Sequence, residues 1–187
     1  VMQGVIDGSI KGLITVGVDP VYSLPNNKQF TEAYQKLEMS LAFSMKKDAT
    51  ASLAQMVAAT PHYLESWGDA QIKKGSFSLT QPTIRPLFNT RQFQDCLLVW
   101  TGNSKAYNQY IKQTWSGVLA GTSWNKALEA GVVASSVNVS NEALSTQKIS
   151  IDTSVSNRSL DADSNQGELE LTLYTKTSLG DGQQANN

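Results

Sequence analysis

The stretch T-V-G-V-D-P-V-Y-S-L-P-N, residues 15–26, decides the fold predicted for this 187-residue chain. It opens inside an almost wholly apolar run, residues 13–18, which is typical of a strand buried on both faces of a parallel sheet. Asp19 and Pro20 end that strand, because proline has no N–H to donate to a neighbouring strand. In an open α/β sheet, the loop beyond the carboxyl end of a strand is the usual place for a ligand. The sequence therefore predicts a ligand-binding loop that starts at Asp19.

The residues that follow alternate between helix and strand patterns. After a possible entry at Pro25, one helical face is predicted by the spacing of Phe30, Ala33, Tyr34 and Leu37. Further elements are a strand at residues 39–43, a short helix at 48–55 with Asp or Thr at its start, and an apolar run at 57–59. This order predicts an α/β fold, namely a Rossmann-like, doubly wound, mostly parallel sheet with flanking helices.

The rest of the chain predicts looser packing of elements around that sheet. Residues 1–9 have the spacing of a helix end, and residues 63–82 read as a loop followed by an extended segment at Phe77 and Leu79. Two more helices are expected where apolar residues return to helical spacing, at residues 93–100 and 107–115, with their faces packed on the sheet.

Composition divides the chain into three parts. Residues 1–131 form the expected Rossmann-like domain, and residues 132–167, rich in Ser, Asn, Asp and Thr, read as a polar linker or insertion. Residues 168–187 begin with alternating Leu and polar residues, as expected for the first strand of a second, C-terminal β domain. We expect the chain to be a piece of a larger protein.

Composition also excludes several functions. The net charge is −1 without a clustered basic face, which argues against nucleic acid as a partner. No apolar stretch reaches the ~20 residues of a membrane span. With one cysteine and one histidine, Cys96 and His62, the chain by itself supplies neither a cysteine-ligated iron–sulfur cluster nor a two-histidine metal site, and structural roles are expected for both.

Three segments resemble the molybdopterin-dinucleotide oxidoreductases, the dimethyl sulfoxide reductase superfamily. Residues 15–25 resemble its W-G-x-N-P-x-x-S-x-P, residues 50–65 its T-A-x-x-A-D-V-V-L-P-A-A-x-x-x-E, and residues 68–78 its G-T-x-x-N-x-E-G-R-x-Q. The similarity runs from about residue 11 to residue 100, and residues 169–187 look like the start of the family's last domain, a β-barrel. It implies loops that wrap the guanine end of a pterin cofactor, and for this chain it implies Asp19, Pro20 and Ser23 as the cofactor-binding residues, if a guanine dinucleotide is bound.

This chain departs from the family pattern at positions that grip the nucleotide. The family's polar residues are replaced at five places, by Ser44, Gln55, Ile72, Lys74 and Ser76. Each lost polar partner of a buried ligand costs ~1–3 kcal/mol, so several losses together would abolish tight binding. The resemblance therefore predicts a domain that binds no cofactor, catalyses nothing by itself and holds no metal.

One branch of the superfamily shows the same pattern, the large iron–sulfur subunits of bacterial alternative complex III. The stretches L-E-S-W-G-D, Q-P-T-I-R-P-L-F-N-T-R-Q and L-Y-T-K-T-S-L-G-D-G-Q-Q-A-N-N resemble those subunits. The resemblance implies a non-catalytic scaffold in a respiratory complex that oxidises quinol. Its iron–sulfur clusters would lie elsewhere in the parent protein, its partners would be other subunits of a membrane-bound complex, and its location would be the periplasmic side of the inner membrane.

Two alternatives stay open. In the first, the chain is the cofactor-binding domain of an active molybdopterin-guanine-dinucleotide reductase of the polysulfide or thiosulfate type. In the second, it is a generic nucleotide-binding α/β domain. The last lacks support, because neither G-x-G-x-x-G nor G-x-x-x-x-G-K-[ST] occurs. Glu65 and Asp69 resemble a carboxylate pair for acid–base chemistry, but a local capping or ion-pairing role of Glu65 is the better interpretation.

Overall fold

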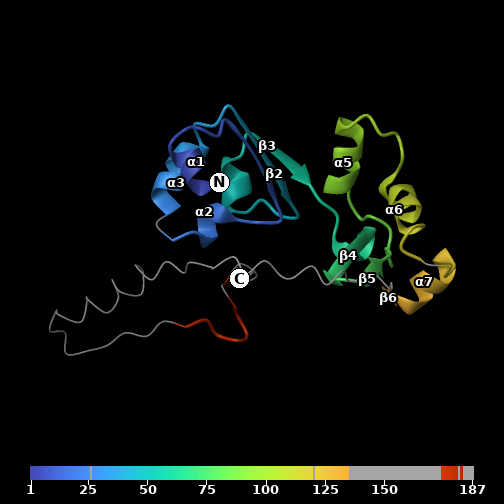
Figure 1. Cartoon of the computed structure of the whole chain (residues 1–187). Helices are drawn as coiled ribbons and strands as arrows, with labels where there is room; N and C mark the ends of the chain where they lie inside the picture. The colour runs from blue at the N-terminus through green and yellow to red at the C-terminus, as the bar shows by residue number, and fades with distance from the viewer. Residues whose placement is uncertain (26, 120, 135–173, 181, 183–187) are drawn as a thin grey trace, which may run out of the picture. The chain divides into compact units, whose positions relative to one another are not determined.

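A computed structural model describes residues 1–25, 27–119, 121–134, 174–180 and 182 (Figure 1). The chain divides into two compact units, Val1–Asn138 and Val139–Asn187. The described helices and strands belong to the first unit. In the second, the described residues hold a turn in which the Gly180 N–H donates to the Lys176 carbonyl (2.8 Å). The linker expected beyond residue 134 and the strand expected from residue 168 lie outside the described residues, apart from positions 174 and 175, which are not in a strand.

The amino-terminal half contains a three-stranded parallel sheet. Its strands are β1 (Gly12–Val16), β2 (Met39–Ser44) and β3 (Met56–Ala59), in the order β1-β2-β3. The register places Ile14 beside Leu41 and Leu41 beside Met56. Helices α1 (Met2–Ile6), α2 (Pro20–Ser23), α3 (Asn27–Tyr34) and α4 (Ala49–Leu53) precede or connect the strands. This arrangement confirms the predicted α/β fold with a parallel sheet and flanking helices.

One face of this sheet carries the first hydrophobic core. Val5 of α1 packs there with Phe30, Tyr34 and Leu37, and Leu13 of β1 lies against them. The buried members of the helical face expected at residues 30–37 are therefore confirmed as core. The helix forms because these apolar residues recur at three- and four-residue spacing, which aligns them on one side.

The opposite face of the sheet is covered only in part. Phe43 of β2 meets Phe93 and Trp100 of α5 (Phe93–Trp100) edge to face, with ring centroids 4.9 and 6.2 Å away. On β1, by contrast, the side chains of Ile14 and Val16 are 37% and 40% exposed. The prediction that β1 is buried on both faces is wrong for the described residues, because β1 is an edge strand there and the contacts from α5 reach β2.

A second, antiparallel sheet follows. Strands β4 (Gly68–Lys73) and β5 (Ser76–Thr80) form a hairpin, and β5 also pairs with β6 (Val132–Ala134). The hairpin turns through Lys74 and Gly75, and Gly75 has a φ of 79°, a backbone conformation that glycine adopts without strain. The sequence predicted the extended segment at β5 but neither β4 nor β6. The first three residues of the expected linker thus belong to this sheet.

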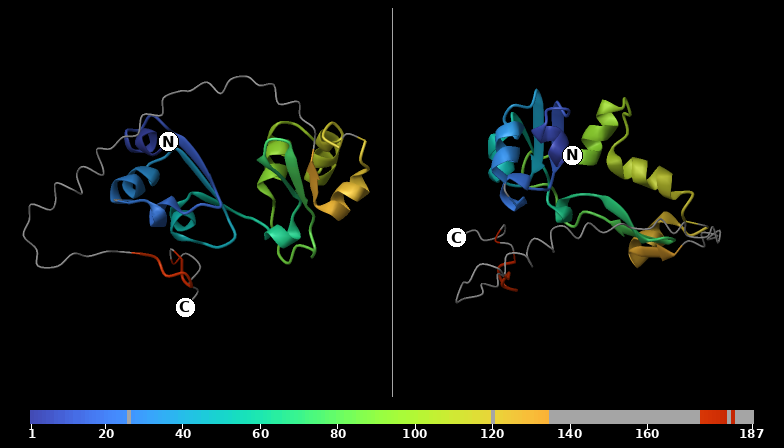
Figure 2. Two further views of the ribbon diagram at one scale, coloured as in Figure 1. Left: turned by 60° about the horizontal axis from the view of Figure 1, so that its bottom comes forward. Right: turned by 60° about the vertical axis from the view of Figure 1, so that its left-hand side comes forward.

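Helices α6 (Tyr107–Trp115) and α7 (Trp124–Ala130) pack on the antiparallel sheet (Figure 2). They bury Ile111, Trp115, Leu119 and Ala127, with Phe77 of β5 packed against this cluster. The predicted helix at residues 107–115 is confirmed, but it packs on this antiparallel sheet, whereas the prediction placed it on the parallel one. Helix α7 was not predicted, although the Ser123 side chain caps its start and Gly131, with φ 69°, ends it.

Candidate functional site

The loops after β1 and β2 form the candidate site. The carboxyl ends of neighbouring parallel strands lie at one edge of a sheet, so these loops are neighbours as well. After β1 the chain turns at Gly17, whose φ of 61° requires glycine, and reaches Asp19 just before α2. Strand β2 ends at Ser44, and the chain then reaches Asp48 and enters α4. The structure therefore joins two loops that are about 30 residues apart in sequence.

The Asp19 carboxylate makes the central contacts of this site. Its Oδ1 accepts hydrogen bonds from the Thr50 N–H (2.9 Å) and from Thr50 Oγ1 (2.6 Å). Its Oδ2 accepts one from the Ala49 N–H (3.2 Å). Thr50 is fully buried, and its Oγ1 also accepts a hydrogen bond from the Val21 N–H (3.0 Å). Three of the roughly four acceptor positions of the carboxylate thus bind groups of the chain itself.

A second carboxylate completes the same arrangement. Asp48 is the N-cap of α4, and its Oδ1 accepts a hydrogen bond from the Ala51 N–H (2.8 Å). Its Oδ2 accepts one from Ser44 Oγ (2.8 Å). The predicted N-cap at Asp48 is confirmed. Together, Asp48 and Asp19 accept hydrogen bonds from the N–H groups of three consecutive residues at the start of α4. The first N–H groups of a helix have no partner within the helix, and here the two carboxylates satisfy them.

The other two predicted cofactor-binding residues lie in the same turn. Pro20 is half-buried at the first position of α2, where its missing N–H costs nothing. Ser23 is exposed, and its Oγ donates to the Asp19 carbonyl (2.8 Å). The structure therefore brings Asp19, Pro20 and Ser23 together in one turn, which the hydrogen bond from Ser23 Oγ to the Asp19 carbonyl stabilises. Sequence reasoning missed Thr50 as the partner of Asp19, although Thr50 opens one of the family-like segments.

The positions that depart from the family pattern have structural roles or face solvent. Gln55 is bound at both ends of its amide: Nε2 donates to the Leu37 carbonyl (2.7 Å), and Oε1 accepts from the Ser40 N–H (3.3 Å). On β4, the Ile72 side chain is 82% exposed. Ser76 begins β5 opposite Ala134 of β6. Gln55 thus joins the segment before β2 to the segment before β3.

Glu65 and Asp69, the second pair of carboxylates, serve separate purposes. Glu65 caps the short 3₁₀ helix Tyr63–Glu65, where its Oε2 accepts from the His62 N–H (2.9 Å). Asp69 accepts hydrogen bonds from the Tyr107 hydroxyl (3.0 Å) and from Trp115 Nε1 (2.9 Å). The expected local capping by Glu65 is confirmed. The two carboxylates accept hydrogen bonds from different donors, Glu65 from backbone N–H groups and Asp69 from two side chains of α6.

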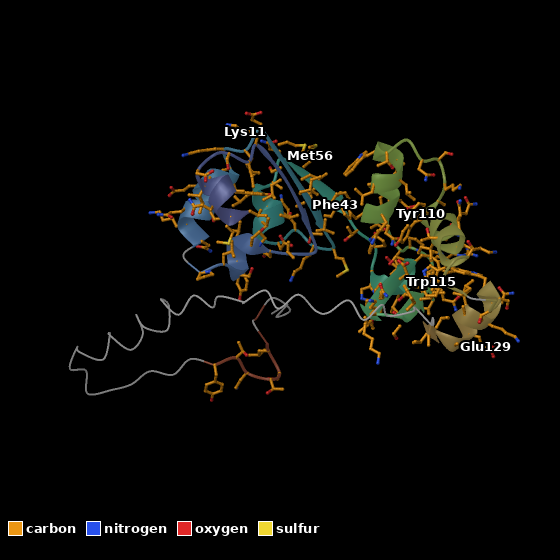
Figure 3. The ribbon with its side chains drawn as sticks, in the orientation of Figure 1. Lys11, Phe43, Met56, Tyr110, Trp115 and Glu129 are labelled. Carbon is orange, nitrogen blue, oxygen red and sulfur yellow. The ribbon has the colours of Figure 1, made fainter. Side chains whose placement is uncertain are left out.

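The carboxylate of Asp69 also affects the tyrosine that it binds. Burial is the larger cause and the negative charge of Asp69 the next, and together they raise the pKa of the Tyr107 phenol far above its usual value. Both causes disfavour the phenolate, burial by removing water and Asp69 by repulsion. Tyr107 is therefore a hydrogen-bond donor to Asp69 at neutral pH, and this contact joins α6 to β4. Trp115, the other donor to Asp69, lies on the same helix (Figure 3).

The remaining candidates for chemistry are His62 and Cys96. His62 caps the 3₁₀ helix through Nδ1, which accepts from the Leu64 N–H (3.3 Å), and Cys96 is a half-buried free thiol on α5. Among the described residues, no group of three or more His, Cys, Asp or Glu side chains is placed to hold a metal ion. No helix in the same residues is long and apolar enough to cross a membrane.

A recess of about 320 Å³ lies away from the Asp19 loop. It is lined by residues of α1 and α3 and by Lys11 and Glu38, which directly precede β1 and β2. These residues mark the amino ends of the strands, the edge opposite to Asp19. The recess therefore does not extend the candidate site.

Comparison with known proteins points to a class of oxidoreductase subunits. The chain is distantly homologous to a molybdopterin-binding-like protein of that class, and it shares its fold with a larger enzyme. The homologue is the molybdopterin-binding-like subunit of menaquinone reductase from Nitratidesulfovibrio vulgaris (strain Hildenborough), with 29% identity over 96 residues. The match covers 49% of this chain and 14% of that subunit.

One solved structure with a similar fold is acetylene hydratase from Pelobacter acetylenicus. It superposes with a TM-score of 0.55 at 13% sequence identity, over 73% of this chain and 20% of that enzyme. No protein-family model matches the sequence. The similarity to the hydratase concerns the fold, and the chain spans a small part of both proteins.

Proposed function

We propose that this chain is part of an iron–sulfur subunit of the molybdopterin oxidoreductase-like type, in a respiratory complex that oxidises quinol. Within that subunit, the described domain is a non-catalytic scaffold that binds no cofactor. The distant homology to a molybdopterin-binding-like subunit of menaquinone reductase supports the general class. The resemblance of residues 64–69, 81–92 and 173–187 to the large iron–sulfur subunits of alternative complex III supports that kind of complex.

The hydrogen bonds of Asp19 are the observation that carries the scaffold proposal. A guanine ring offers N–H donors that a carboxylate would accept. In this chain the carboxylate accepts from Thr50 and Ala49 instead, with distances of 2.6–3.2 Å. A nucleotide would compete with three hydrogen bonds that also hold the start of α4. Breaking the two from the buried Thr50 leaves its N–H and its hydroxyl unsatisfied, at ~1–3 kcal/mol for each group.

The replaced positions support the same proposal. Ser44 donates to Asp48, and Gln55 bridges Leu37 and Ser40, so both polar side chains serve the fold. Ile72 offers no polar group at all. The polar atoms that would surround a guanine are thus either engaged or missing at these places.

The electron-transfer role belongs to the proposal as well. A Cys₄ iron–sulfur cluster needs four thiolates, and this chain contains one cysteine, so the clusters would be bound by other parts of the parent protein. The proposed partners are the other subunits of a membrane-bound respiratory complex, and the proposed location is the periplasmic side of the bacterial inner membrane. Both follow from the resemblance to alternative complex III.

The alternative function is the cofactor-binding domain of an active molybdopterin-guanine-dinucleotide reductase of the polysulfide or thiosulfate type. One observation favours it: Asp19, Pro20 and Ser23 lie together at the carboxyl edge of a parallel sheet, where nucleotides bind in α/β folds. In that case Asp19 would accept a guanine N–H through its remaining acceptor position.

Metal and pterin analysis of the full-length protein decides between these functions. The scaffold proposal expects iron but less than a tenth of an equivalent of molybdenum or pterin per protein. Stoichiometric molybdenum together with pterin would refute it and establish the alternative.

A guanine nucleotide titration gives a second test. We expect no saturable heat of GDP binding up to millimolar concentration, either for the wild type or for Ser23→Ala. Saturable binding that disappears in Asp19→Asn but persists in Glu38→Gln would support the alternative. Glu38 is the matched control because it is a carboxylate at the opposite edge of the sheet, and circular dichroism would verify that each variant is folded.

A further inference from the structure

The antiparallel half of the domain contains a series of aromatic side chains that can be oxidised by one electron. The rings of Trp67 and Trp124 lie 6.4 Å apart, measured between their centroids, and Trp124 meets Trp115 edge to face at 6.3 Å. At the other end, the rings of Tyr107 and Tyr110 stack at 6.5 Å. Aromatic rings at these separations are paired in or near contact. We call these five residues the aromatic series.

The Asp69 carboxylate joins the tryptophans of this series to its tyrosines. Its Oδ2 accepts from Trp115 Nε1 (2.9 Å), and its Oδ1 accepts from the Tyr107 hydroxyl (3.0 Å). An indole or a phenol that loses an electron becomes a strong acid, so it readily gives up its N–H or O–H proton. A base within hydrogen-bond reach takes that proton directly. Packing alone explains the ring contacts, and the shared carboxylate adds a proton acceptor where the two residue types meet.

Exposure gives the series a direction. Trp115 is 2% exposed, so a soluble reagent does not reach its ring, whereas Tyr110 is 41% exposed. At neutral pH an oxidised indole takes an electron from a phenol when a base receives the proton of the phenol. An oxidising equivalent on the tryptophans therefore moves to Tyr107, beside Asp69, and from there to the surface at Tyr110.

The tryptophan of the parallel half has different neighbours. The ring of Trp100 lies 6.2 Å from that of Phe43 and 6.5 Å from that of Phe93. Reagents that oxidise tryptophan and tyrosine by one electron do not oxidise phenylalanine. A radical formed on Trp100 therefore stays there as far as these ring neighbours are concerned, which makes Trp100 an internal reference for the aromatic series.

We propose that the aromatic series carries one-electron oxidising equivalents out of the core to the surface at Tyr110. The oxidants belong to the class of strongly oxidising one-electron radicals, such as the carbonate radical anion. Such a radical takes one electron from the half-buried Trp67 or Trp124 and becomes carbonate, and Trp115 then gives an electron to the oxidised tryptophan. The route uses side chains of the described domain alone, so it is the same in a scaffold and in an active enzyme.

The later steps balance in electrons and in protons. Tyr107 gives one electron to the Trp115 radical cation and its hydroxyl proton to Asp69, which leaves a neutral indole, a phenoxyl radical and a protonated carboxyl group. Tyr110 then gives one electron to Tyr107, Asp69 returns the proton to Tyr107, and Tyr110 releases its own hydroxyl proton to water. A soluble reductant of the thiol or ascorbate class restores Tyr110 with one electron and one proton.

Site-resolved oxidation of the full-length protein tests this route. Carbonate radicals are generated by a light flash, and peptide mass spectrometry locates the oxygenated tryptophan and tyrosine products, each normalised to the product at Trp100. In the wild type, Tyr110 should carry more product than Trp115. Tyr107→Phe keeps the ring but removes the hydroxyl, so the product at Tyr110 should fall about threefold or more, and the product at Trp115 and Trp124 should rise by a similar factor.

A second variant removes the base instead of the phenol. Asp69→Asn keeps the size of the side chain, and it should shift the products from Tyr110 to Trp115 as Tyr107→Phe does. Tyr63→Phe is the matched control, because Tyr63 is 65% exposed and its ring neighbour is His62, outside the aromatic series. It should leave the ratio of the Tyr110 product to the Trp115 product unchanged. Circular dichroism verifies that each variant is folded.

Flash kinetics of the wild type add a measurement that needs no variant. The absorbance of the phenoxyl radical should rise at the rate at which that of the indolyl radical decays, and a phenoxyl signal independent of this decay would overturn the proposal. The same product distribution in the wild type, Tyr107→Phe and Asp69→Asn would overturn it as well. So would a shift in Tyr63→Phe as large as that in Tyr107→Phe, because the aromatic series would then not decide where oxidation ends.

Discussion

The two sheets of this domain satisfy their buried polar groups in different ways. In the parallel half, Asp19 and Asp48 bind backbone amides at the start of α4, so carboxylates support the loops around them. In the antiparallel half, Asp69 binds the side chains of Tyr107 and Trp115, which come from a helix 38 and 46 residues further along the chain. One half uses its acids to close neighbouring loops, and the other uses an acid to fix a helix on a sheet.

This difference shows why one edge of the parallel sheet looks like a ligand site. Parallel strands send their loops to a common edge, where amides and carboxylates converge whether or not a ligand is bound. When the chain supplies both the donors and the acceptors, the same edge becomes a structural joint. The hydrogen bonds between Asp19 and Thr50 are of that kind.

The largest effect is expected at the aromatic centre of the antiparallel half. Trp115 is 2% exposed, packs edge to face on Phe77 and Trp124, and donates to Asp69. Trp115→Ala should lower the free energy of unfolding by ~3–5 kcal/mol, because it opens a cavity and removes the donor to Asp69 Oδ2, while the Tyr107 hydroxyl still donates to Oδ1. Trp115→Phe should cost less, since it keeps much of the packing.

Urea denaturation followed by circular dichroism measures both changes. A loss below 1 kcal/mol for Trp115→Ala would show that the antiparallel half does not depend on its tryptophan core. That result would remove the contrast between the halves.

The joint at Asp19 should give the next largest effect. Thr50→Val keeps the shape of the side chain but removes its hydrogen bonds to Asp19 and Val21, so we expect a loss of ~1–3 kcal/mol in unfolding free energy. Asp19→Ala should cost a similar amount. Because the two side chains share one hydrogen bond, the double variant should cost less than the sum by ~0.5–3 kcal/mol.

A double-mutant cycle by urea denaturation measures this coupling. Ser52→Ala, on the exposed side of the same helix, is the control and should change stability by less than ~0.5 kcal/mol. Additive losses from Thr50→Val and Asp19→Ala would mean that the bond between the two loops is not a shared support.

The sequence predicted the parallel half better than the antiparallel half, for a physical reason. The strand–helix alternation of residues 13–59 follows from local periodicity, and Phe30, Tyr34 and Leu37 lie in the core as their spacing indicated. Strand β4, with the sequence G-D-A-Q-I-K, has low strand propensity and depends on pairing with β5. Local periodicity carries no information on which strands pair, so it did not predict β4, although Gly75 indicates the turn of the hairpin.

Burial was predicted less well than secondary structure. The helix at residues 93–100 is confirmed, but its buried residue is Leu98, while Leu97 and Trp100 are 41% and 53% exposed. Apolar spacing identifies a helix, yet the face that becomes buried depends on which elements pack against it. The same limitation applies to the candidate site: Asp19, Pro20 and Ser23 lie in one turn as expected, but the contact with Thr50 comes from the tertiary fold.

Each half contains one tyrosine whose pKa is raised, and alkaline unfolding compares them. Burial is the main cause for Tyr34, and for Tyr107 burial is joined by the Asp69 carboxylate. A pKa that is higher in the folded than in the unfolded chain stabilises the fold fully below the unfolded value of 10.0, and this contribution is lost as the pH rises above it. The wild type should therefore lose stability above about pH 10, and Tyr34→Phe and Tyr107→Phe should each lose less.

Salt distinguishes the two tyrosines. Added salt screens the repulsion between Asp69 and the Tyr107 phenolate but leaves the burial of Tyr34 unchanged. We expect 1 M NaCl to reduce the loss of stability at alkaline pH that depends on Tyr107. The loss of stability that depends on Tyr34 should stay the same. Unfolding midpoints between pH 8 and pH 11 measure this, and equal salt responses would contradict the distinct roles of the two halves.

The smallest effect is expected at the amino edge of the parallel sheet. Lys11 and Glu38 form an ion pair at 3.9 Å, with side chains 67% and 74% exposed. Solvent screens such a pair, so Glu38→Gln should change the unfolding free energy by less than ~0.5 kcal/mol, even though Glu38, like Asp19, is a carboxylate that flanks a strand of the parallel sheet. Urea denaturation at 20 mM and 500 mM NaCl checks this. A loss as large as that of Asp19→Ala would mean that the stabilising carboxylates of the parallel half are not confined to the edge where the loops meet α4.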